Sequence, residues 1–152
     1  MKKTEKKKSE RTLLAIDPSI NYCGAAIFDV KTKHLLHAEL VVPDKVLKRD
    51  GEFYDKAHSV FEKVSMLREK WGCIAIACEL PDHWSVAGHM ARESGSITKL
   101  SFVCGMFYQM RNSVQRFVFA LPREWKGQLS KDVMKNRIES TYVGKEEWQF
   151  DK

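Results

Sequence analysis

Two short apolar runs that each end in a single carboxylate constrain this chain more than any other feature. The first run, Leu13–Ile16, leads into Asp17, and the second, Cys73–Cys78, leads into Glu79. An apolar run of this length, bounded by turn residues, is typical of a strand buried in a sheet. A proline follows each acid within two residues, and proline cannot donate to a strand ladder. The pattern therefore predicts two carboxylates held at the rigid ends of buried strands.

A carboxylate at the end of a buried strand is costly unless it is paired, hydrogen-bonded or bound to a metal ion. A turn-initiating aspartate that caps its own backbone would explain Asp17 alone. It does not explain why a second buried strand also ends in an acid. If the two strands are parallel neighbours, Asp17 and Glu79 lie at the carboxyl edge of the sheet, where open α/β sheets place their sites. Two hard oxygen ligands suit Mg²⁺ or Mn²⁺.

The hydrophobic periodicity predicts an α/β fold with a mixed five-stranded sheet in the order 3-2-1-4-5 and helices on both faces. The first three strands form an antiparallel meander, and the first, fourth and fifth run parallel. Gly24 allows a close backbone approach in the second strand. The expected strands are Thr12–Asp17, Cys23–Asp29, His34–Val42, Cys73–Glu79 and Arg116–Leu121. The expected helices are Gly51–Trp71, Ser96–Met110 and Ser130–Tyr142, with a loop over 125–129.

The chain of 152 residues fits a single domain, and its net charge of +6 suggests a polyanionic partner. Most of that charge lies in a basic tail, residues 1–11, which precedes the domain expected over residues 12–152. Such a tail touches phosphates without specificity, although a solubilising leader would have the same composition.

The cysteines and the hydropathy favour the cytoplasm. No run is long and apolar enough for a membrane span, and no signal-peptide core follows the basic start. The chain has no CxxC pair, which favours reduced and mostly buried thiols. A zinc site from Cys78, His83 and His89 fits no structural zinc spacing. The cysteines are Cys23, Cys73, Cys78 and Cys104.

A basic stretch follows the fifth strand and supplies candidate phosphate contacts. A run of charges is usually a solvated helix face, but beside two strand-end acids it favours contact with phosphates. Lys99 adds a positive charge on the second helix, and Trp84 is a candidate for stacking on a base or for covering the end of the sheet. The residues of the stretch are Arg123, Lys126, Lys131, Lys135 and Arg137.

Four segments in order resemble the motifs of RuvC-type Holliday-junction resolvases in the RNase H-like superfamily. Leu13–Gly24 resembles their first motif, and Ile74–Glu79 resembles their second acidic motif. Ser96–Leu100, followed by Gly105, is similar to the start of their next helix. Pro122–Lys131 resembles their basic segment, most of all in phage-encoded members. The resemblance extends from Leu13 to Tyr142.

The resemblance implies a Mg²⁺-dependent homodimer that cuts branched DNA by two symmetric nicks, through attack of water on a phosphodiester. It implies that Asp17 and Glu79 are metal ligands, and that Lys126 and Lys131 contact phosphate at the catalytic site. It places the protein in a bacterial or phage-host cytoplasm. The family completes its site with one or two aspartates on a later helix, which is not recognisable here. Either Asp151 takes that role, or the chain stops short of the helix, or the site is incomplete.

Two other functions remain open from the sequence. A non-catalytic relative would keep the fold and the basic face and bind branched DNA without cutting it. An actin-like nucleotide-binding domain would use Asp17–Ser19 and Gly24 as a phosphate loop, but no second loop with paired glycines is present.

Overall fold

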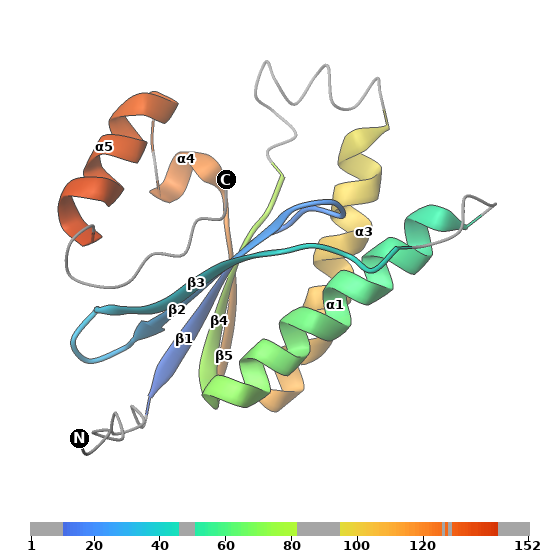
Figure 1. Cartoon of the computed structure of the whole chain (residues 1–152), viewed down its shortest axis with the longest axis horizontal. Helices are drawn as coiled ribbons and strands as arrows, with labels where there is room; N and C mark the ends of the chain where they lie inside the picture. The colour runs from blue at the N-terminus through green and yellow to red at the C-terminus, as the bar shows by residue number, and fades with distance from the viewer. Residues whose placement is uncertain (1–10, 46–50, 82–94, 126, 128, 143–152) are drawn as a thin grey trace.

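The computed structural model describes residues 11–45, 51–81, 95–125, 127 and 129–142. Its strands form one sheet with helices on either side (Figure 1). The strands are β1 (Thr12–Asp17), β2 (Cys23–Asp29), β3 (Leu35–Val41), β4 (Cys73–Glu79) and β5 (Arg116–Ala120). The helices are α1 (Glu52–Trp71), α3 (Ser96–Tyr108), the 3₁₀ helix η1 (Gln109–Ser113), α4 (Pro122–Trp125) and α5 (Lys131–Tyr142).

The strand order is β3-β2-β1-β4-β5, which confirms the order expected from the sequence. β1 pairs antiparallel with β2, and β2 pairs antiparallel with β3. β4 runs parallel to both β1 and β5. The two apolar runs are therefore adjacent parallel strands in the middle of the sheet, and their carboxyl ends lie at the same edge.

The core lies between the sheet and the pair α1 and α3, which lie together on one side of it in Figure 1. Leu14 and Ile76 point into it from the strands, and Val60 and Phe107 meet them from the helices, all fully buried. Burying a side chain of this size stabilises the fold by roughly 1.5–3 kcal/mol. Gly72 ends α1 with a left-handed φ of 61°, and its N–H donates to the carbonyls of Arg68 and Glu69.

The other face of the sheet differs from the expectation. β1 was expected to be a buried strand, and it is fully buried on one face but only half-buried on the other, where Leu13 and Ala15 point. α4 and α5 lie on that side of the sheet in Figure 1. The ring of Tyr142 at the end of α5 lies 6.0 Å from that of Phe28. The carboxylates of β1 and β4 thus belong to the less covered face.

A short helix, α4, follows β5, and the sequence did not predict it; it overlaps the loop expected over 125–129 only at Trp125. β5 ends at Ala120, and Pro122 begins the short helix α4. Proline suits the first helical position, because that position needs no N–H donor. The side chain of Glu124 accepts a hydrogen bond from the Leu121 N–H at 2.7 Å, which caps the turn. Among the described helices, none is both long and apolar enough to cross a membrane.

Candidate metal and nucleic-acid site

Asp17 and Glu79 end neighbouring parallel strands at the same register. The last paired residues of β1 and β4 are Ile16 and Cys78, so the two acids follow directly side by side. Neighbouring strands lie about 4.8 Å apart. Because side chains alternate along a strand, both carboxylates point away from the face that packs on α1 and α3. Asp17 is exposed and Glu79 is half-buried.

Asp17 was expected at the rigid end of a buried strand, and it lies at the end of β1 with its side chain exposed. The sheet edge is open to solvent at this point, so the desolvation penalty for a charged aspartate is small. The turn that follows is ordered by Ser19, whose hydroxyl accepts hydrogen bonds from the N–H groups of Asn21 and Tyr22, both at 3.3 Å. The arrangement gives a rigid, solvent-accessible carboxylate.

Gly24 keeps space beside Asp17. It is the partner of Asp17 across the antiparallel pair of β1 and β2. A Cβ atom at this position would lie 3.3 Å from the Cβ of Asp17, closer than ordinary van der Waals contact. The close approach expected at Gly24 is confirmed, and it involves the candidate ligand itself.

Replacing Gly24 by valine is therefore expected to push the Asp17 side chain aside and to lower Mn²⁺ affinity by about tenfold, as loss of a neighbouring support does in metal sites. Ala26→Val is the matched control, because Ala26 lies on the same strand and face but pairs with Ala15. Isothermal titration calorimetry measures the Mn²⁺ affinity of both variants. Equal affinity in the two variants would contradict a spacing role for Gly24.

Three buried thiols, those of Cys23, Cys78 and Cys104, lie on the core side of the sheet. The Cys104 thiol of α3 donates to the Glu79 carbonyl at 3.6 Å, and the Cys78 thiol donates to the same oxygen at 3.5 Å. Burial raises the pKa of Cys23 to about 12. Sequence reasoning expected buried thiols but not their contact with Glu79.

The basic candidates are spread over several elements. The Lys99 ammonium lies 5.9 Å from the centre of the Phe53 ring. Arg123 is exposed on α4, and Lys135 is exposed on α5 with its ammonium 3.8 Å from the carboxylate of Glu139. Lys131 is the first residue of α5, and the Ser130 hydroxyl caps this helix by accepting a hydrogen bond from the Val133 N–H at 3.4 Å. Trp84, Lys126 and Asp151 lie outside the described residues.

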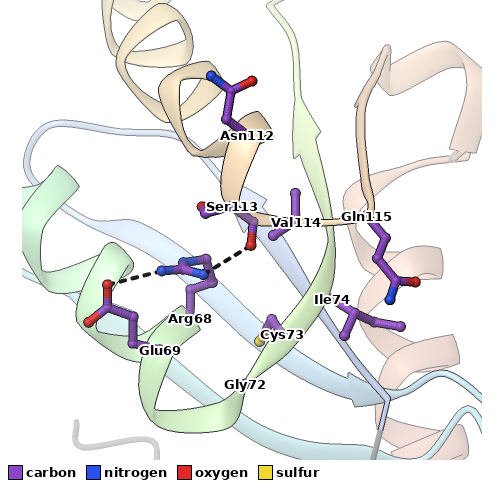
Figure 2. A pocket seen from close by; sticks show the side chains of 9 residues that line it. All are labelled: Arg68, Glu69, Gly72, Cys73, Ile74, Asn112, Ser113, Val114 and Gln115. Carbon is purple, nitrogen blue, oxygen red and sulfur yellow. Dashed lines mark hydrogen bonds and ion pairs between the residues drawn. The ribbon is translucent and has the colours of Figure 1, made fainter.

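A shallow pocket of about 560 Å³ lies at the opposite end of β4 from Glu79. Figure 2 shows it between the end of α1, the start of β4 and the connection from η1 to β5. The guanidinium of Arg68 donates to the Ser113 carbonyl at 3.3 Å and pairs with Glu69 at 2.9 Å. These contacts fasten the end of α1 to that connection, and they neutralise the charge of the pocket. The carboxylate edge is therefore the stronger candidate site.

The donor set at this edge fits a hard divalent cation in part. Asp17 and Glu79 supply carboxylate oxygens, which Mg²⁺ and Mn²⁺ prefer. Within the described parts of the chain, no three histidine, cysteine or acidic side chains are grouped so as to hold a metal ion. A site of two carboxylates leaves most of the positions around Mg²⁺ to water, phosphate or a further ligand.

Comparison with known proteins finds similarity in structure but not in sequence. No family model matches the chain, and no curated protein is similar in sequence. Thermus thermophilus RuvC in complex with a Holliday junction substrate matches with a TM-score of 0.63 and 14% identity, over 92% of this chain and 85% of that one. A second T. thermophilus RuvC structure matches with a TM-score of 0.59 and 15% identity, over 85% and 78%.

The yeast mitochondrial Holliday junction resolvase matches with a TM-score of 0.52 and 13% identity, over 85% of this chain and 62% of that one. All three share the chain's architecture at identities too low to transfer residue roles. The five-stranded mixed sheet in the order 3-2-1-4-5, with its flanking helices, is the RNase H-like fold of the RuvC-type resolvases.

Proposed function

We propose that this protein is a divalent-metal-dependent endonuclease that cleaves branched DNA at four-way junctions. The observation that carries the proposal is the placement of Asp17 and Glu79 side by side at the carboxyl edge of adjacent parallel strands. The likeness of the fold to resolvases supports it, one of them in complex with a Holliday junction substrate. The motifs resemble those of phage-encoded members most, which favours the cytoplasm of a bacterium or phage host as the place of action.

The residues take distinct roles in this proposal. Asp17 and Glu79 hold Mg²⁺ or Mn²⁺, and Asp151 is the proposed third carboxylate. A bound ion of this kind supplies charge neutralisation at the phosphodiester and activates water. Lys126 and Lys131 contact the phosphate and stabilise the charge that develops on it. The proposed DNA contacts beyond this site are Lys99, Arg123, Lys135 and Trp84.

Cleavage of a synthetic four-way junction tests the function. With Mg²⁺, the protein should produce paired nicks at symmetric positions on two strands of like polarity, and it should leave a linear duplex of the same sequence intact. Chelation by EDTA should stop the reaction, because the two carboxylates alone do not activate water. Tight junction binding without nicks would favour the non-catalytic relative. The absence of junction binding would contradict both the nuclease and the non-catalytic relative.

Two symmetric nicks require two equal sites, and we propose a C₂ homodimer that contacts through α3. Lys99 is the one charged residue of α3, so the helix is apolar on nearly all sides. Such a helix is usually buried all round, yet Phe102 and Tyr108 are each 43% exposed. Gly105 is also exposed in mid-helix, and a Cβ there would meet nothing within 4 Å. A partner helix that packs closely would account for this glycine.

Placing a charge on this face should separate the protomers. Phe102→Glu is expected to convert the dimer into a monomer, since a carboxylate at the centre of an apolar contact is costly to desolvate. Met66→Glu on α1 is the control, because Met66 is 67% exposed and lies on another helix. Sedimentation equilibrium gives the mass in solution of each variant. A dimer that persists in the Phe102 variant would place the contact elsewhere.

A further inference from the structure

The carbonyl of Glu79, at the end of β4, faces a proline where the ladder with β1 would continue. The Leu80 N–H donates to the Ala120 carbonyl at 3.0 Å, so Leu80 directs its amide groups toward β5. In a parallel sheet successive residues direct their amide groups to alternate neighbours. The Glu79 carbonyl therefore points toward β1. The next ladder donor there would be residue 18, which is a proline without an N–H.

The thiols of Cys78 and Cys104 reach this carbonyl instead. Their sulfur atoms lie 3.5 and 3.6 Å from the Glu79 oxygen. Both side chains are almost completely buried, at 0% and 1% exposure, so water does not compete with these weak donors. Cys104 comes from α3, 25 residues further along the chain, and it connects that helix to the end of β4.

We propose that Cys104, with Cys78 beside it, is a positioning residue for Glu79, an inference that rests on the proposed role of Glu79 as a metal ligand. The peptide that carries the Glu79 carbonyl also fixes the rotation of the strand at the Glu79 Cα atom. A hydrogen bond from the helix at this point holds the direction in which the carboxylate leaves the sheet. The ladder cannot do this, because Pro18 interrupts it.

The test compares Cys104→Ala, which removes the donor, with Cys104→Ser, which restores one. The alanine variant should bind Mn²⁺ about tenfold more weakly by calorimetry, the effect typical of losing an outer support of a metal ligand. The serine variant should recover most of the affinity. Cys73→Ala is the matched control, because Cys73 is a buried thiol at the opposite end of β4 and should leave Mn²⁺ affinity unchanged.

A second readout does not depend on metal. The ¹³C chemical shift of the Glu79 carbonyl in the metal-free protein should move in Cys104→Ala and return toward the wild-type value in Cys104→Ser. Thermal unfolding of each variant shows whether the fold is kept.

The outcomes separate this inference from the proposed function. If Glu79→Gln loses Mn²⁺ but Cys104→Ala keeps both the affinity and the carbonyl shift, the positioning role is overturned and the metal site stands. If the wild-type protein does not bind Mn²⁺ at all, the proposed function fails, and a positioning role toward a metal ligand fails with it. A loss of affinity that serine does not restore would assign the effect to packing and overturn the hydrogen-bond role.

Discussion

Replacing Asp17 by asparagine should lower Mn²⁺ affinity by at least about tenfold and slow junction cleavage by at least the same factor. The substitution keeps the size of the side chain but removes one of the two negative charges at the sheet edge. Glu79→Gln should have a comparable effect, because the two residues occupy equivalent positions at the ends of β1 and β4. Calorimetry measures the Mn²⁺ affinity, and single-turnover nicking of a labelled junction measures the cleavage rate.

Asp29→Asn is the control for this experiment. Asp29 ends β2 at the opposite edge of the sheet, where it is the partner of Thr12. Its carboxylate accepts the N–H groups of Lys31 and Thr32 at 2.8 and 2.7 Å, so it organises a turn and does not face the candidate site. Equal Mn²⁺ affinity in Asp17→Asn and Asp29→Asn would refute the assignment of Asp17 as a ligand.

The sheet could be predicted from the sequence because its signals are local. Each apolar run spans one strand, and the prolines after Asp17 and Glu79 mark where the strands end. Gly72 marks the end of α1 in the same way. The strand order then follows from the short connections and from the preference for right-handed crossovers. The placement of the two carboxylates at one edge needed no further information.

The supporting contacts could not be predicted, because they depend on packing between distant segments. Cys104 reaches the Glu79 carbonyl only because α3 packs on the core face of the sheet. Residue spacing along the chain carries no sign of it. The short helix α4 was missed for another reason: Pro122 was interpreted as the end of a strand, whereas proline is equally suited to the first turn of a helix. The exposure of Asp17 could not be predicted either, because it depends on how little of the sheet face opposite α1 and α3 is covered.

Replacing both Lys126 and Lys131 by alanine should make junction binding markedly less sensitive to salt. Each phosphate contact on duplex DNA contributes a slope of about −0.9 to the dependence of log affinity on log salt, because binding releases condensed counterions. Loss of two contacts should therefore flatten the slope by roughly two units. Between 50 and 200 mM salt this corresponds to about a tenfold smaller loss of affinity. Fluorescence anisotropy with a labelled junction measures the slope.

The basic tail would obscure this measurement, so both proteins should lack residues 1–10. Arg11 is kept, because its carbonyl accepts the Val30 N–H at 3.0 Å and holds the start of β1. Lys31→Ala with Lys70→Ala is the matched control: both are exposed lysines near the opposite edge of the sheet, and their loss changes the net charge equally. If the two double variants show the same slope, the lysines after β5 act only through overall charge. A flatter slope in the Lys126 and Lys131 variant alone would assign them direct contacts with phosphate.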